Sequence, residues 1–245
     1  MKIDVLTLFP EMFSAVKTSM LGRAEKNGIL DINLVNIRDY TLDKHNRVDE
    51  YPFGGGVGML IQAEPVFRAL DAVQADRKKI VYMSPKGRIL DQDKIKELSE
   101  EENLVVLCGH YEGIDQRILD YWDIEEVSVG DYILTGGEPA AIVMIDAVSR
   151  MIPGVLGAET GVMEESIYSG LLEAPQYTKP REYMDMPVPD VLLSGHHLNI
   201  HLWKYEKALE ITRERRPDLF EKYLENHGEL TKQEKKILEK VRSLV

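Results

Sequence analysis

Short apolar runs rich in β-branched residues recur along the first half of the chain. They occupy residues 3–8, 32–37, 80–83, 104–108 and, less cleanly, 127–129. Between them, apolar side chains recur with a helical period at residues 64–73, 91–100 and 138–151. Strands that alternate with helices predict an α/β fold around a mostly parallel sheet.

The pattern changes after residue 153. The stretch 157–189 holds several glycines and prolines and is interpreted as an irregular linker. Beyond Ser194 the pattern is helical, and Thr231 and Glu234 have the spacing of a capping box before the last helix. We therefore expect an α/β domain over 1–158, an interdomain linker over 159–190 and a small helical domain over 191–245.

The charge of the chain is distributed unevenly. The formal net charge is -12 at pH 7, which by itself argues against a nucleic-acid partner, because phosphate contacts need clustered Lys and Arg. Residues 201–245, however, hold 11 Lys and Arg against nine Asp and Glu, a net of +2, which leaves about −14 for residues 1–200. A polyanion is thus expected to contact the end of the chain.

The sequence also indicates the cellular compartment of the protein. Cys108 is the one cysteine, which excludes an internal disulfide framework and fits a reducing environment. The N-terminus resembles a first strand more than a signal peptide, and no apolar run approaches the ~20 residues of a membrane helix. We expect a cytoplasmic protein.

Three glycine-bearing loops follow or lie near the apolar runs, at residues 54–58, 108–115 and 129–138. Glycine lets a ligand approach the backbone closely, and open α/β sheets bind ligands in loops at strand ends. The usual nucleotide fingerprints are absent: no glycine loop continues as GK[ST], and the first strand does not run into G-x-G-x-x-G. The loops therefore predict a ligand site of a different geometry.

Nine fragments occur in a fixed order along the chain. They are LFPEMF (8–13), GGGVGM (54–59), SPKGR (84–88), CGHYEGID (108–115), SVGDYILTGGE (128–138), SRMIPGVLG (149–157), LLEAPQYTKP (171–180), VPDVLLSG (188–195) and RRPDL (215–219). As a set they closely resemble the TrmD family of tRNA (guanine-N1)-methyltransferases, members of the knotted SPOUT class. The resemblance implies a deep trefoil knot, a homodimer, and methylation of guanosine 37 beside the tRNA anticodon with S-adenosylmethionine as donor.

The resemblance also implies which residues bind the methyl donor. They follow three strands: Tyr82, Ser84 and Pro85; then Gly109, Tyr111, Glu112 and Gly113; then Val129, Gly130, Asp131, Tyr132, Ile133, Leu134, Gly136 and Gly137. Backbone groups of such loops can bind an adenine edge, and the Glu112 carboxylate suits a cationic ligand.

Methylation of guanine N1 requires two further groups. A base has to remove the N1 proton, and a positive charge has to stabilise the developing charge on O6. The family's base is an aspartate in the linker, and the matching residue here is Glu165, with Glu164 as the weaker candidate. Arg150, at the end of the helix that begins near residue 138, matches the family's substrate-polarising arginine; capping of the helix is its alternative role.

The helical domain is expected to bind the tRNA anticodon stem-loop. Candidate contacts are Ser194, His197, Lys204, Arg213, Arg215 and Arg216, with Lys207 as the alternative to Lys204. His197 and His201 are spaced i, i+4 but lack an acidic companion, so no transition metal is assigned. A Mg²⁺ ion bound near the acidic residues remains an open alternative at the level of the sequence.

Two other functions remain open at the level of the sequence. One is a catalytically silent tRNA-binding protein that has kept the fold. The other is a SPOUT methyltransferase that acts on another RNA site.

Overall fold

A computed structural model describes residues 1–156 and 170–243 of the chain. By its contacts the chain divides into two compact units, Met1–Glu159 and Thr160–Val245.

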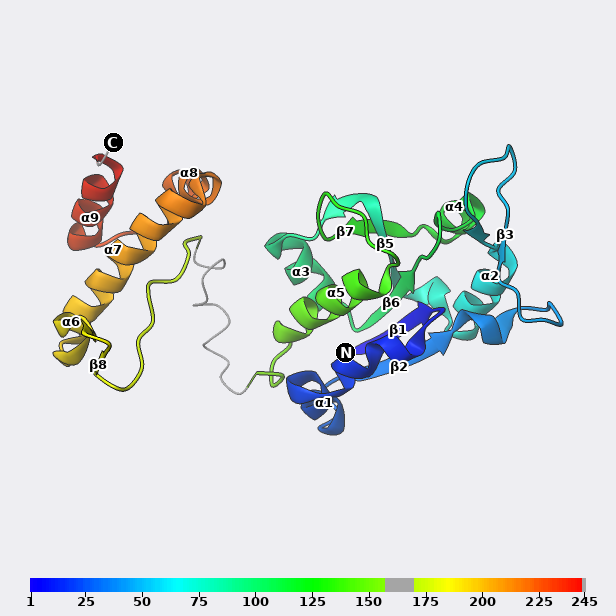
Figure 1. The fold of residues 1–245 in the computed structure, drawn as a ribbon, viewed down its shortest axis with the longest axis horizontal. Helices are drawn as coiled ribbons and strands as arrows, with labels where there is room; N and C mark the ends of the chain where they lie inside the picture. The colour runs from blue at the N-terminus through cyan, green and yellow to red at the C-terminus, as the bar shows by residue number, and fades with distance from the viewer. Residues whose placement is uncertain (157–169, 244–245) are drawn as a thin grey trace. The chain divides into compact units, whose positions relative to one another are not determined.

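The first unit is built on a five-stranded parallel sheet (Figure 1). Its strands, in spatial order, are β2 (Asp31–Asn36), β1 (Lys2–Thr7), β6 (Asn103–Cys108), β5 (Lys79–Ile89) and β7 (Glu125–Ser128). Each of the five apolar runs of the sequence forms one of these strands, and all four pairings are parallel. The predicted α/β fold with a mostly parallel sheet is thus confirmed.

Strand β5 is longer than its apolar run predicts. The run ends at Met83, but the strand continues to Ile89 through polar residues. The pairing with β7 is broken there by a register shift, since Met83 and Arg88 both lie opposite Val127. Residues 84–87 therefore bulge from the sheet, which a periodicity of apolar residues does not reveal.

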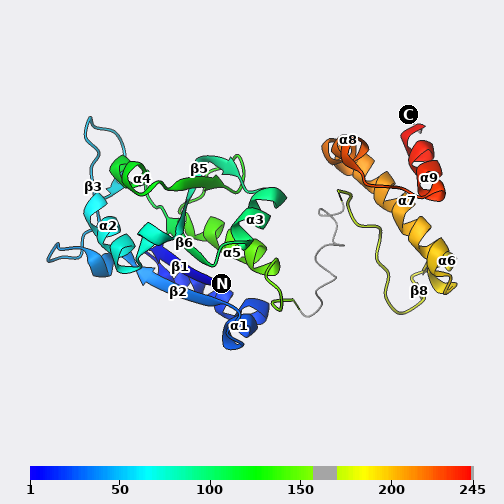
Figure 2. The same ribbon diagram turned by 180° about the vertical axis from the view of Figure 1, so that it is seen from behind.

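Helices cover both faces of the sheet, as Figures 1 and 2 show. One hydrophobic core contains buried residues of η1 (Pro10–Lys17), α1 (Ser19–Lys26), α3 (Gln92–Ser99) and α5 (Glu138–Arg150). The other contains residues of η2 (Ile37–Tyr40), α2 (Ala63–Ala72) and α4 (Gln116–Trp122). Successive strand residues alternate between these cores, as the pleat requires. The short elements are β3 (Asp49–Glu50) and β4 (Leu60–Ile61), which pair antiparallel, and η3 (Ala75–Arg77).

Ion pairs occupy the amino-terminal edge of the sheet. The buried Asp4 carboxylate accepts hydrogen bonds from Lys78 Nζ at 2.7 Å and Asn33 Nδ2 at 2.8 Å. The ammonium of Lys94, which is 1% exposed, lies 2.5 Å from a Glu125 carboxylate oxygen. Because buried charges are costly unless they are paired, loss of one partner is expected to destabilise this edge.

The second unit contains α6 (Asp190–Leu193), α7 (His197–Arg215), α8 (Pro217–Asn226) and α9 (Lys232–Ser243). Its core is formed by Leu171, Leu209, Phe220, Leu238 and Val241. The predicted capping box is confirmed: Thr231 N donates to Glu234 Oε2 at 2.8 Å, and Glu234 N donates to Thr231 Oγ1 at 3.3 Å.

Two features interrupt the stretch that was expected to be irregular. A hairpin joins β8 (Glu182–Tyr183) to β9 (Met186–Pro187) through Met184 and Asp185, which have φ of 49° and 58°. Two positive φ values define the tight turn, yet neither residue is the glycine or asparagine that usually signals one. Leu171 is buried in the helical core, and Leu172 N donates to Thr212 Oγ1 at 2.8 Å.

None of the helices in residues 1–156 and 170–243 is long and apolar enough to cross a membrane.

Candidate functional site

Loops from three parts of the first unit meet at the carboxyl-terminal edge of the sheet. β6, β5 and β7 are neighbours in the sheet, so the loops that follow them lie together. Gly137 N donates to Gly109 O at 2.7 Å, which joins the loop after β7 to the loop after β6. Glu112 N donates to Met59 O at 3.0 Å, which adds the glycine-rich loop before β4. Backbone hydrogen bonds thus hold the glycine-bearing loops as one assembly.

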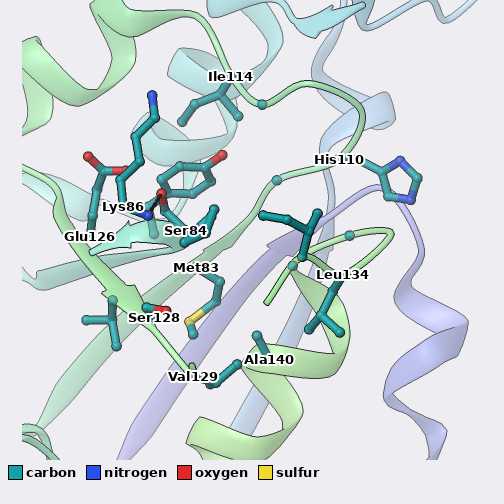
Figure 3. Close-up of a pocket in the computed structure, with 18 of the residues that line it drawn as sticks. Met83, Ser84, Lys86, His110, Ile114, Glu126, Ser128, Val129, Leu134 and Ala140 are labelled. Atoms are coloured by element: carbon teal, nitrogen blue, oxygen red, sulfur yellow. Dashed lines mark hydrogen bonds between the residues drawn. The ribbon is translucent and has the colours of Figure 1, made fainter. Parts of the chain in front are cut away.

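The loops after β5, β6 and β7 line a cavity of about 260 Å³, close to the lower end of the ~300–1,000 Å³ of typical small-molecule pockets. Figure 3 shows Lys86 and Glu126 on one side of the pocket and Leu134 on the other. Residues of β5 and its bulge, of the 109–114 loop and of the 129–137 loop form its wall.

The structure brings together fourteen of the fifteen residues that the resemblance assigns to the methyl donor. Those that line the cavity are Tyr82, Ser84, Pro85, Gly109, Tyr111, Glu112, Gly113, Val129, Gly130, Tyr132, Ile133, Leu134, Gly136 and Gly137. Asp131 does not line it and is exposed on the same loop.

The cavity also has lining residues that the sequence did not single out. They are Met83, Lys86, His110, Ile114, Gln116, Leu119, Glu126, Val127, Ser128, Thr135 and Ala140. Lys86 lies within the SPKGR fragment, so its place next to Ser84 and Pro85 in the sequence could have identified it as a cavity residue. Glu126 carries no such signal, because its place depends on the register of β7 against β5.

Close backbone approach explains two of the glycines. A Cβ at Gly109 would lie 2.5 Å from the Tyr82 hydroxyl, and a Cβ at Gly137 would lie 2.9 Å from Gly109 N. Any larger residue at either position would push apart two walls of the cavity. The glycines are therefore needed for the loops to pack at this distance.

Burial governs the ionisation of two residues at the site. The pKa of Tyr82 is raised to about 12 by burial and by the nearby Glu126 carboxylate. The pKa of the Cys108 thiol is raised well above its ordinary value by burial, with a further contribution from Glu138. Cys108 is fully buried and remains a thiol at neutral pH, so it is not a nucleophile.

Of the catalytic candidates, Arg150 lies within the described residues. Arg150 is the last residue of α5, where its side chain is half-buried and has an interaction partner. Glu165 and its alternative Glu164 lie outside the described residues.

The six candidate tRNA contacts do not form one cluster. Ser194 caps the end of α6, and His197 is the first residue of α7. Lys204 lies within α7, and Arg213, Arg215 and Arg216 lie at its end. α7 has 19 residues, so its ends are separated by roughly 27 Å at 1.5 Å per residue.

The arginines at the end of α7 differ in their partners. Arg213 Nη1 donates to Val241 O, and Arg216 makes a two-point contact with Asp218 at 2.8 and 2.5 Å. Arg215 and Lys204 are exposed. In the described part of the chain, no group of three or more His, Cys, Asp or Glu side chains could hold a metal ion, so a Mg²⁺ site has no support there.

Comparison with known proteins gives consistent matches. The family model for tRNA (Guanine-1)-methyltransferase TrmD matches residues 1–222. A protein of Clostridium acetobutylicum is 52% identical over 239 residues, which cover 97% of this chain and 96% of the relative. One of Ruminiclostridium cellulolyticum is 55% identical over 226 residues, 91% of this chain and 97% of the relative. Both relatives are described as tRNA (guanine-N(1)-)-methyltransferase.

Proposed function

We propose, since this chain belongs to the TrmD family of tRNA (guanine-1)-methyltransferases, that it transfers the methyl group of S-adenosylmethionine to N1 of guanosine 37 in tRNA. The donor supplies a methyl group activated by a sulfonium centre. The chain itself has to bind that donor, orient the guanine against it and take up the N1 proton.

One observation carries the binding half of the proposal: a single cavity is lined by fourteen of the fifteen residues assigned to the donor. The residues present fit such a ligand. Loop backbone approaches the cavity at glycines, which suits the edge of a planar adenine, while Leu134 and Ile133 add apolar wall. The Glu112 carboxylate is complementary to the positive sulfonium.

Proton removal is assigned to Glu165, with Glu164 as the alternative. Guanine N1 carries its proton at neutral pH, so a carboxylate has to accept it as the new N–C bond forms. Arg150 is assigned to the developing negative charge on O6, where a fixed cation stabilises the transition state. Arg150 ends α5, whose first turn borders the cavity at Ala140.

We assign residues 1–158 to the knotted SPOUT class, with a deep trefoil knot, and the chain to a homodimer. The knot is assigned from membership of the TrmD family, and the hydrogen bond from Gly137 N to Gly109 O joins the two loops that it would bring together. The dimer is inferred from α5, because residues 140–148 of this helix are apolar almost all round and Val143 remains 54% exposed on it. Sedimentation at micromolar concentration should give a dimer; a monomer would contradict this assignment.

The tRNA anticodon stem-loop is assigned to the helical residues 191–245, joined to the catalytic domain through 159–190. Their charge balance supports this, because they carry the positive part of an acidic chain. Cytoplasm is the expected compartment, since it holds the tRNA substrate.

A methyl-transfer assay tests the proposal against its alternatives. Labelled S-adenosylmethionine should transfer label to a tRNA transcript with guanosine 37 but not to a matched transcript with adenosine there. No transfer to either would favour a silent tRNA-binding protein. Equal transfer to both would favour a methyltransferase that acts on another RNA site.

A further inference from the structure

The first turn of α5 contains a buried carboxylate that the activity assigned above does not use. Glu138 follows the last two glycines of the 129–137 loop and is 1% exposed. A fully buried glutamate is costly unless its oxygens are satisfied. A buried carboxylate beside the cavity therefore points to a specific role.

One oxygen of this carboxylate is anchored to the first strand. Thr7 Oγ1 donates to Glu138 Oε1 at 2.8 Å, and Phe9 N donates to Thr7 Oγ1 at 2.9 Å. Thr7 is the last residue of β1 and is itself fully buried. The start of α5 is thereby tied to the carboxyl end of β1, 131 residues away in sequence.

The other oxygen lies against the loop that lines the cavity. A Cβ at Gly136 would be 2.5 Å from Glu138 Oε2 and 2.7 Å from the His110 ring. Glu138 Oε2 itself has no hydrogen-bond partner in the described structure. Gly136 is thus held between a carboxylate and an imidazole, at the point where the 109–115 and 129–137 loops are bridged.

We infer that Glu138 is a positioning residue for the donor site. The Thr7 hydroxyl holds its carboxylate in place, and the carboxylate holds Gly136 and Gly137 at the cavity wall. The inference rests on the proposed function, because the ligand whose affinity it predicts is S-adenosylmethionine. Glu138 lies behind the wall and does not line the cavity, so its effect on binding is indirect.

The test compares variants of the full-length protein by calorimetric binding of S-adenosylmethionine and by thermal unfolding. Thr7→Val keeps the shape but removes the hydroxyl, and should weaken binding about tenfold, which is ~1.4 kcal/mol. Thr7→Ser keeps the hydroxyl and should restore affinity to within about twofold of the original chain. In methyl transfer, Thr7→Val should raise KM for the donor and leave kcat at saturation nearly unchanged.

Ser149→Ala is the matched control, since Ser149 is a fully buried hydroxyl of the same helix without a hydrogen-bond partner. It should change neither affinity nor melting temperature. If Thr7→Val does not fold, Glu138→Leu replaces it, since it also removes the hydrogen bond between Thr7 and Glu138 and should weaken binding about tenfold. In Glu138→Gln the amide oxygen still accepts from Thr7, so affinity should stay within about threefold.

A lower melting temperature of Thr7→Val with unchanged affinity would overturn the inference, as would a Thr7→Ser variant that binds as weakly as Thr7→Val. A tenfold loss in Glu138→Gln would also overturn it. Failure of the unsubstituted protein to bind S-adenosylmethionine would instead count against the proposed function.

Discussion

The two edges of the parallel sheet are built from different interactions. At the amino-terminal edge, Asp4 is paired with Lys78, and Lys94 with Glu125, by short contacts between charged side chains. At the carboxyl-terminal edge, glycine-bearing loops are joined through backbone hydrogen bonds and enclose a cavity. On the cavity wall, the side chains of Lys86 and Glu126 make no hydrogen bond or ion pair in the described part of the chain.

The same strands thus serve stability at their amino-terminal ends and ligand binding at their carboxyl-terminal ends. Pairing of buried charges at the first edge contributes to folding and needs no ligand. At the second edge, the loops are already joined by backbone hydrogen bonds, and the side chains of Lys86 and Glu126 face a cavity that can hold a ligand. Substitutions at the two edges should therefore alter different measurements.

The largest effect is expected from the proposed base. Glu165→Gln keeps size and hydrogen bonding but cannot accept the N1 proton, so single-turnover methylation should slow by roughly 10²- to 10⁴-fold. Affinity for S-adenosylmethionine and the free energy of unfolding should not change. Glu165→Asp should retain activity, and Glu164→Gln should have a modest effect.

The reverse pattern, a slow Glu164→Gln and an unchanged Glu165→Gln, would transfer the role to Glu164. If neither variant slowed, proton removal would belong to water or another group.

The next largest effect is expected at the amino-terminal edge. Lys78→Met leaves the Asp4 carboxylate, 1% exposed, without its closest cation. Breaking such a pair should lower the free energy of unfolding by roughly 3–5 kcal/mol, measured by urea denaturation, with donor affinity unchanged. The control is Lys2→Met, because the Lys2 ammonium is 3.9 Å from Asp4 and its side chain is 44% exposed, so its loss should cost under about 1 kcal/mol. A loss of donor affinity in Lys78→Met would contradict the assignment of stability to the amino-terminal edge and of donor binding to the carboxyl-terminal edge.

A substitution at the carboxyl-terminal edge is expected to have a smaller effect, which is to weaken the binding of S-adenosylmethionine. In Gly137→Ala the new methyl group would lie 2.9 Å from Gly109 N, so two cavity loops have to move apart. Overpacking of this kind costs roughly 1–3 kcal/mol, and calorimetry should show donor affinity about 5- to 150-fold weaker. Gly228→Ala is the control, because nothing lies within 4 Å of its added Cβ. Unchanged affinity in Gly137→Ala would refute the cavity as the donor site.

The smallest effect concerns pH. Burial raises the pKa of Glu125, but hydrogen bonds from Lys79 and Lys94 outweigh it, so the pKa is lowered from 4.5. A lowered folded-state pKa adds stability that is present above pH 4.5 and is lost as the pH falls below it. Glu125→Gln should therefore flatten the acid dependence of the free energy of unfolding, while Glu100→Gln, at an exposed position, should not. Equal acid dependence in the original chain and in Glu125→Gln would contradict this.

The sequence predicted the regular parts of this fold and most of the cavity wall. The five apolar runs became the five strands because β-branched residues alternate between two cores. The bulge at 84–87 was missed, since it depends on the pairing of β5 with β7 and not on either strand alone. The hairpin at Met184 and Asp185 was missed because its turn holds neither glycine nor asparagine.

Side-chain partners across long sequence separations were the least predictable. Fourteen donor-site residues could be named from motifs, whereas the contact of Thr7 with Glu138 spans 131 residues and has no local pattern. The sequence likewise did not predict that the candidate tRNA contacts are spread along α7. Nor did it predict that Arg216 donates to Asp218.

The measurement that tests the central claim most directly is mass-spectrometric identification of the methylated nucleoside after the purified protein has acted on a tRNA transcript. Digestion should yield 1-methylguanosine, and fragment mapping should place it at position 37 next to the anticodon. A methyl group on another atom of guanine, on ribose or at another position would contradict the proposed function, as would a digest with no methylated nucleoside.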